Sequence, residues 1–180
     1  MKKYIIHEAG KEAYHAGSKA TRDCEEILLQ EDFQRIDICN YQEESGFWIK
    51  VKKRLQLIQL IRIKRKSIVV VQHPMYIGTT YMRALKIIHC LKRVKSIFVI
   101  HDLESLRKMF QDYKDLYEKL DNMMFQIGDV FIVHNARMKD YLVRDRFVDE
   151  KKLVVLGLFD YLAYKTDEER NGEIERERRE

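Results

Sequence analysis

Short hydrophobic runs rich in Val and Ile alternate along the chain with longer segments whose apolar residues recur at helical spacing. The runs predict strands at Lys3–His7, Arg35–Cys39, Ser67–Gln72, Ser96–Ile100, Val130–Val133 and Leu153–Leu156. The helical pattern predicts helices at Ser18–Gln30, Phe47–Ile63, Thr79–Lys92, Ser105–Met124 and Ala136–Arg144. Alternating strands and helices indicate βαβ units, and all-apolar strands indicate a parallel sheet covered on both faces. We therefore expect an α/β fold, a three-layer, Rossmann-like, doubly wound parallel sheet in a single domain.

Four of the six histidines follow directly on such runs: His7, His73, His101 and His134. Parallel strands end at a common edge of the sheet, and ligands bind beyond their carboxyl ends. The sequence thus predicts that four imidazoles point toward one rim, where chemistry would take place. For any single one of them, the alternative is a histidine that hydrogen-bonds a neighbouring loop carbonyl.

The composition is that of an ordinary globular protein, with 46% hydrophobic and 35% charged residues in 180. The net charge of +5 permits anionic partners but requires none, and nucleic acid is not expected because the basic residues lack interleaved aromatics. The three cysteines, Cys24, Cys39 and Cys90, are isolated in the sequence. No run has the length of a signal-peptide core or of a bilayer span of roughly 20 residues. We expect a cytoplasmic protein, with contact to the inner face of the membrane left open.

The first connection between strand and helix contains Ala16-Gly17-Ser18-Lys19-Ala20. Ser18 is a good N-cap, and a helix start exposes free N–H groups and the positive end of the helix dipole. Lys19 adds a positive charge. The segment is neither a GxGxxG motif nor a P-loop, so an anion site and an ordinary capped helix both stay open.

His101-Asp102 directly follows a predicted strand, which makes Asp102 a candidate general base beside an imidazole. The alternative is that Asp102 only caps the next helix, with Ser105 or Arg107 completing the cap. His134-Asn135 and His73-Pro74 carry the same two interpretations, cap or ligand contact, and Asn135 is the expected N-cap of its helix. A metal site is not expected, since no HxH or HExxH spacing occurs.

Basic clusters at both ends of the predicted helix Phe47–Ile63 bracket an apolar middle. Such a basic amphipathic helix either rests on anionic lipid or has a solvated charged face. Residues 1–164 are expected to form the folded domain, and residues 165–180 a charged tail or the start of a linker. The aromatic stretch Phe159–Tyr164 either packs back on the sheet or meets a partner, including a second copy of the chain.

Five elements taken together resemble the N-terminal half of bacterial GT-B glycosyltransferases of the galactofuranosyltransferase and adhesin-glycosylating glucosyltransferase type. They are Ala16–Ala20, Val71–Pro74, Ile100–Arg107, Val133–Asn135 and Val155–Leu162. The resemblance covers residues 3–164. It implies an acceptor-side, Rossmann-like domain that faces a second domain across a cleft, the second domain holding a UDP-sugar.

The resemblance implies roles for residues at the rim. Gly17, Ser18 and Lys19 would approach the donor diphosphate. In an inverting transfer Asp102 would be the base, with His101 orienting it, whereas in a retaining transfer Asp102 would bind the acceptor. His73, His134 and Asn135 would line the acceptor pocket. No metal or other cofactor is expected, because helix ends and a lysine would stabilise the leaving diphosphate.

The predicted function is therefore the acceptor-side half of a sugar-nucleotide-dependent glycosyltransferase in the biosynthesis of a cell-surface polysaccharide or glycoprotein. It would transfer a glucosyl or galactofuranosyl unit to a glycan or glycoprotein, and the chain is expected to be inactive without a donor-binding domain. Two alternatives stay open: a non-catalytic module that pairs with a complete transferase, and a small α/β hydrolase that uses the histidine rim.

Overall fold

The computed structural model describes residues 1–9, 16–39, 47–75, 78–106 and 114–157. A six-stranded sheet forms its centre, with every strand parallel to its neighbours in the order β2-β1-β3-β4-β5-β6. The strands are β1 (Lys3–Ala9), β2 (Gln34–Cys39), β3 (Ile68–His73), β4 (Lys95–Ile100), β5 (Val130–Val133) and β6 (Leu153–Val155). The expected Rossmann-like α/β fold is confirmed.

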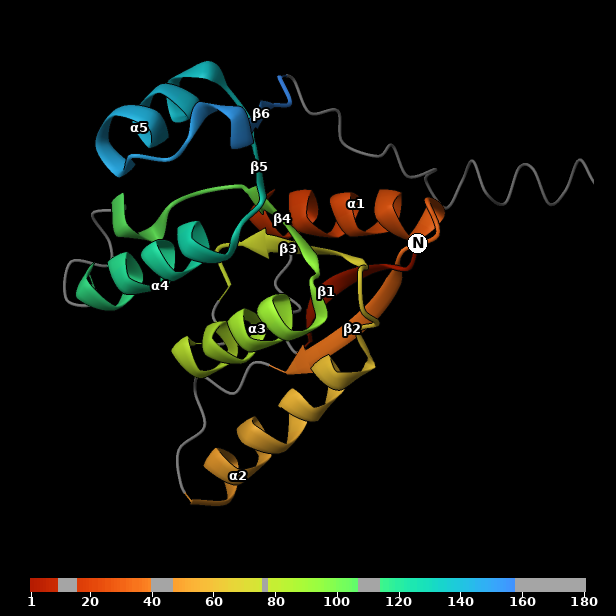
Figure 1. Cartoon of the computed structure of the whole chain (residues 1–180). Helices are drawn as coiled ribbons and strands as arrows, with labels where there is room; N and C mark the ends of the chain where they lie inside the picture. The colour runs from red at the N-terminus through yellow and green to blue at the C-terminus, as the bar shows by residue number, and fades with distance from the viewer. Residues whose placement is uncertain (10–15, 40–46, 76–77, 107–113, 158–180) are drawn as a thin grey trace, which may run out of the picture.

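Among the described residues, five α-helices and three short 3₁₀ segments connect these strands (Figure 1). The helices are α1 (Ala16–Gln30), α2 (Phe47–Leu55), α3 (Thr79–Lys92), α4 (Lys114–Ile127) and α5 (Ala136–Arg146). The 3₁₀ segments are η1 (Gln56–Arg62), η2 (Glu104–Leu106) and η4 (Glu150–Lys152). The expected tail at 165–180 and the stretch Phe159–Tyr164 lie outside the described residues.

The two faces of the sheet carry different helices, because successive side chains of a strand point to opposite faces. Helix α1 packs on one face through Cys24 and Leu28, against Ile5, Val70 and Val99. On the opposite face η1, α3, α4 and α5 cover the larger core cluster, and α1 lies across the sheet from α3 and α4 (Figure 1). This change of side occurs between β1 and β3, where the strand order reverses. Ligand sites in open α/β sheets form at such a reversal, beyond the carboxyl ends of the strands.

Two predicted helices differ from those observed. The helix expected at Phe47–Ile63 is α-helical only to Leu55 and continues as η1, because a repeat of three then carries Leu57, Leu60 and Ile63 into the core. The helix expected at Ser105–Met124 begins instead with the short η2, and α4 extends over Lys114–Ile127. Arg107, which was expected to complete the helix cap formed by Asp102, lies outside the described residues.

Candidate functional site at the carboxyl ends of the strands

Three side chains from neighbouring strand ends form a chain of hydrogen bonds at the carboxyl edge of the sheet, here called the rim. Gln72 is in β3, His101 follows β4, and His134 follows β5. Nε2 of His101 lies 2.8 Å from Oε1 of Gln72, and Nδ1 of His101 lies 3.2 Å from Nε2 of His134. The side chains meet because β3, β4 and β5 are adjacent and in register.

The direction of this chain follows from its first member. Nε2 of Gln72 donates to the backbone oxygen of Thr21 in α1, at 2.9 Å, so the Gln72 oxygen faces His101 as an acceptor. His101 must then donate from Nε2, which leaves its Nδ1 as an acceptor when the ring is neutral. His134 accordingly donates from Nε2 to His101. Through Gln72, helix α1 thus fixes the tautomers of two rings that lie one and two strands away from β3.

Both imidazoles are held toward the neutral form. Burial, followed by the neighbouring His134 and His73, lowers the pKa of His101 to about 4. Burial also lowers the pKa of His134. Near neutral pH the rim therefore presents uncharged imidazoles, which can orient a hydroxyl by hydrogen bonding without carrying charge.

Asp102 and Asn135 follow the two histidines and are partly or fully open to solvent. Oδ1 of Asp102 accepts from the backbone N–H of Leu103 at 2.8 Å. Oδ1 of Asn135 accepts from the backbone N–H of Met138 at 2.8 Å, which confirms Asn135 as the N-cap of α5. Both ring nitrogens of His101 have partners, Gln72 and His134, so His101 orients His134 in this structure.

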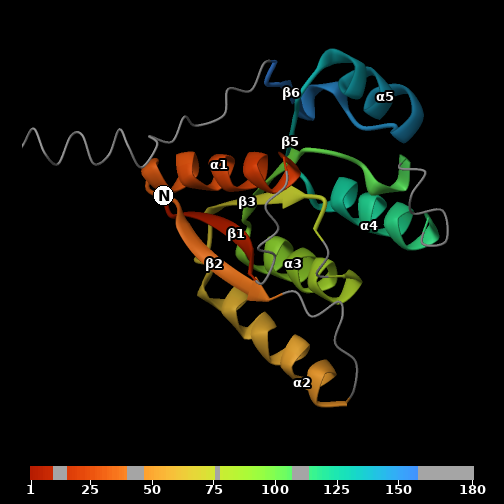
Figure 2. The same cartoon turned by 180° about the vertical axis from the view of Figure 1, so that it is seen from behind.

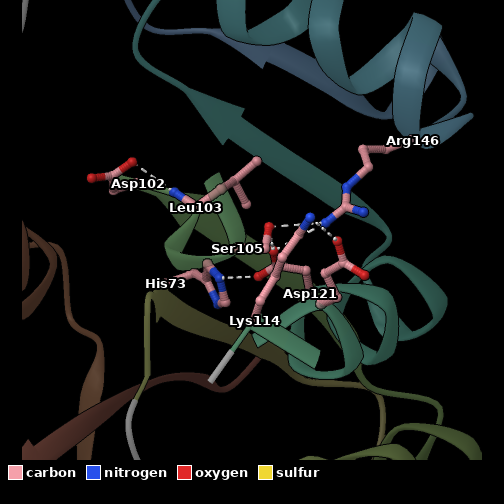
Figure 3. Close-up of polar contacts among 8 residues, drawn as sticks. His73, Asp102, Leu103, Ser105, Lys114, Asp121 and Arg146 are labelled. Atoms are coloured by element: carbon pink, nitrogen blue, oxygen red, sulfur yellow. Dashed lines mark hydrogen bonds and ion pairs between the residues drawn. The ribbon is translucent and has the colours of Figure 1, made fainter. Parts of the chain in front are cut away.

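His73 lies below the rim, in a buried polar cluster (Figure 3). Its Nε2 is 2.8 Å from Oδ1 of Asp121 in α4, and the two residues are 5% and 1% exposed. Ser105 donates to the second oxygen of Asp121 at 2.5 Å, and Arg146 of α5 lies 3.2 Å from that oxygen. Asp102 points away from this cluster (Figure 3). The cluster ties β3, η2, α4 and α5 together.

The four histidines do not share one rim as expected, because alternate strand positions face opposite sides of the sheet. His73 faces α4, whereas Gln72, one position earlier, faces α1. His7 lies within β1 and not at its end, and its Nδ1 contacts Glu25 of α1 at 2.7 Å. Only His101 and His134, which follow their strands, are in direct contact at the rim.

The expected anion site coincides with the first turn of α1, which follows β1 beside the reversal in strand order. The helix begins at Ala16, so Ser18 is its third residue and not the N-cap. Gly17, Ser18 and Lys19 thus lie in the first turn, whose backbone N–H groups have no intrahelical acceptors. Nζ of Lys19 pairs with the fully buried Asp23 at 2.5 Å. The helix end brings positive charge to this edge, and Lys19 is anchored by a carboxylate.

Three residues of the site were not singled out from the sequence: Gln72, Asp121 and Arg146. Asp121 had a detectable signal, since it falls in the apolar stripe of its helix with Leu120, Met124 and Ile127. A carboxylate in such a stripe requires a buried partner. Within the described ranges, no three His, Cys, Asp or Glu side chains are grouped to hold a metal ion.

A comparison with protein-family models places this geometry in context. The model described as "Glucosyltransferase 3-like, N-terminal domain" matches residues 2–158. The chain belongs to this family. A search of curated proteins found no match.

Membership in the glucosyltransferase 3-like family confirms the predicted resemblance and relates the chain to glycosyltransferases, with sugars as substrates in general. The match extends across all six strands, so it includes the rim and the start of α1. Across the described part of the chain, none of the helices combines the length and apolarity needed to span a bilayer.

Proposed function

We propose that this chain is the acceptor-side domain of a GT-B glycosyltransferase that uses a sugar nucleotide. The observation that carries the proposal is the Gln72–His101–His134 chain, which places neutral imidazoles at the carboxyl ends of β3, β4 and β5, where the partly exposed Asp102 directly follows His101. Its family, the N-terminal domain of glucosyltransferase 3-like proteins, supports the same conclusion. A donor-binding domain would complete the cleft.

In the proposed reaction a hexosyl unit, glucosyl or galactofuranosyl, passes from a UDP-sugar to a hydroxyl of a glycan or glycoprotein. Asp102 takes the proton of that hydroxyl as its oxygen bonds to the anomeric carbon, and the bond from that carbon to the diphosphate breaks. His134 and Asn135 contact the acceptor. His101 is a positioning residue that fixes the His134 ring, and His73, expected to contact the acceptor directly, supports the rim from below.

The start of α1 is the proposed contact for the leaving diphosphate. The N–H groups of Gly17, Ser18 and Lys19 and the positive end of the dipole would stabilise its charge, in the role that a metal ion fills elsewhere. If so, Lys19→Ala raises the KM for the donor more than the KM for the acceptor. The reverse pattern would reject the phosphate assignment.

The role of Asp102 is tested by Asp102→Asn in the protein that carries this chain together with a donor-binding domain. We expect kcat for hexose transfer from UDP-glucose to fall by about 100-fold or more, with the KM for the donor unchanged. Asp115→Asn is the matched control, because Asp115 is an exposed carboxylate in the first turn of α4. Equal turnover of Asp102→Asn and the control would remove Asp102 from the mechanism.

A further inference from the structure

An exposed apolar ridge runs along α2 and η1, on the side away from the sheet. Leu55, Ile58 and Ile61 recur every three residues and are 57%, 58% and 64% exposed. In a 3₁₀ helix such residues lie directly above one another. Trp48 is two helical turns before Leu55 on the same side of α2 and is 74% exposed. We call these four residues the apolar ridge.

The ridge is not a part of the core that failed to pack. A second stripe at the same spacing packs into the core: Leu60 in η1 and Ile63 directly after it are each 1% exposed. With one stripe fully buried, the exposed stripe is not required to fill the core. Contiguous exposed apolar surface of this kind typically marks an interaction site.

Helix α3 extends the same face. Ile87 and Leu91, one turn apart, are 57% and 68% exposed. Nζ of Lys92 donates to the backbone oxygens of Ile61 and Ile63, at 2.6 and 2.7 Å, and so holds the end of α3 against the end of η1. Helices α2 and α3 lie on the same side of the sheet in both views (Figures 1 and 2).

The charge of this part of the chain is of one sign. From Phe47 to Ile100 the sequence contains thirteen Lys and Arg residues and no Asp or Glu. The remaining 126 residues contain 21 Lys and Arg against 29 Asp and Glu. The modest net charge of the whole chain therefore conceals a strongly basic segment that bears the ridge and an acidic remainder.

Many of these cations are exposed around the ridge. Lys50, Lys52 and Arg54 are exposed on α2, and Arg62, Lys64, Arg65 and Lys66 are exposed at the end of η1 and just after it. Long basic side chains extend their charged ends to a polar surface while apolar neighbours insert more deeply. An apolar strip flanked by Lys and Arg is the pattern of a helix that lies in a membrane interface.

We propose that the face formed by α2, η1 and α3 binds an anionic lipid bilayer, with Trp48 and the aliphatic ridge in the interface and the flanking cations at lipid phosphates. A second copy of the chain is disfavoured, because two like faces would oppose cation to cation. RNA is disfavoured because three of the four ridge residues, Leu55, Ile58 and Ile61, are aliphatic, and a surface that binds single strands presents several rings on which successive bases stack. The proposal is independent of the reaction assigned to the rim.

Trp48 provides a direct probe, since it is the only tryptophan in the chain. The experiment mixes the full chain with vesicles of equal parts phosphatidylcholine and phosphatidylglycerol, and in parallel with pure phosphatidylcholine. We expect the Trp48 emission to shift to shorter wavelength, and the protein to sediment with the vesicles, only for the anionic composition. High salt should reverse most of the binding.

Two sets of variants separate the charge contribution from the apolar one. Lys64→Gln, Arg65→Gln and Lys66→Gln should each weaken partitioning by about fivefold, the equivalent of about 1 kcal/mol per charge near the surface. Ile58→Ser should weaken it by about tenfold through lost apolar burial. The matched control is Phe147→Asn, because Phe147 is 89% exposed at the end of α5 and its φ of 55° suits Asn.

Loss of binding in the ridge and charge variants, with Phe147→Asn equal to wild type, supports the proposal. Absence of binding to anionic vesicles at low salt overturns it, and so does equal binding to neutral vesicles. The proposal is also overturned if the chain binds RNA but not vesicles. It is likewise overturned if the chain does not bind vesicles but self-associates in a way that Ile58→Ser abolishes, since either result assigns the face to another partner. Each readout is a physical binding measurement, so a failure of the reaction proposed for the rim would leave these results unaffected.

Discussion

His134 donates from Nε2 to Nδ1 of His101 across 3.2 Å, and this one bond links the ends of β4 and β5. It holds only while His101 is neutral, since a protonated His101 would donate from both nitrogens. His134 would then have to turn Nε2 into an acceptor, or the bond would break. The protonation state of His101 thus determines whether Nε2 of the partly exposed His134 acts as a hydrogen-bond donor or acceptor.

The stability of the protein should decrease as the pH is lowered, because His101 of this pair resists protonation in the folded state. The folded pKa of His101 is about 4, below the ordinary value of 6.5. Below about pH 6.5 His101 becomes protonated in the unfolded chain, whereas in the folded protein it stays neutral down to about pH 4. The free energy of unfolding therefore decreases by up to about 3 kcal/mol across that range. Urea unfolding at several pH values measures the loss. His101→Gln should flatten the profile, and His89→Gln, outside the rim, should not. Parallel profiles for wild type and His101→Gln would contradict the account.

Two arginines of α5 should differ sharply in their contribution to stability. Arg146 is close to the buried Asp121 and Ser105, whereas the exposed Arg144 pairs with the surface carboxylate of Asp145. Arg146→Met should lower the free energy of unfolding by about 3 kcal/mol, because it leaves a buried carboxylate undercompensated. Arg144→Met should have no measurable effect. Equal effects in thermal or urea unfolding would show that the cluster beneath the rim is not a stabilising unit.

Lys19 should contribute to stability as well as to the proposed donor contact. Its Nζ pairs with Asp23, which is fully buried, so Lys19→Met should cost about 1–2 kcal/mol in urea unfolding. Adding Asp23→Asn removes the buried charge and should recover part of that loss. A loss of stability in the double variant equal to the sum of the losses in Lys19→Met and Asp23→Asn would show that the two residues are not coupled.

Gly128 should tolerate no side chain. A Cβ at this position would lie 2.2 Å from Cζ of Phe131, a fully buried ring that stacks on Phe98 with centroids 6.1 Å apart. Gly128→Ala should therefore cost about 2 kcal/mol through overpacking. Lys119→Ala, at an exposed position on the preceding helix α4, should change stability by less than about 0.5 kcal/mol. Similar unfolding curves for both variants would contradict this packing.

Much of the fold could be predicted from the sequence because the strands are apolar on both faces. Two elements, β5 (Val130–Val133) and α3 (Thr79–Lys92), were predicted with their observed bounds. Apart from the helices predicted at Phe47–Ile63 and Ser105–Met124, the other element ends that differ from the prediction do so by one or two residues. A shift of two residues at the start of α1 places Ser18 inside the first turn, so that it is not the N-cap that the sequence predicted.

The site was harder to predict because a single position along a strand changes the face. Gln72 and His73 are neighbours in β3, yet one bonds α1 and the other α4. A histidine after an apolar run shows which edge it is near but not which helix it meets. The pairing of Asp121 with His73 depends on how α4 packs over the sheet, which no local pattern encodes. The residues that follow their strands, His101 and His134, were the ones that met as expected.

The central claim, that the rim between β3 and β5 is the sugar-binding side of a glycosyltransferase, is tested most directly by NMR of histidine side chains. The full chain, labelled with ¹⁵N, is titrated with a panel of free hexoses and N-acetylhexosamines while the imidazole signals are followed. We predict shifts at His134, and weaker ones at His101, with a constant signal at His89, which lies near the opposite ends of the strands. Shifts that centre on His89, or their absence at His134 with every sugar at saturating concentration, would contradict the claim.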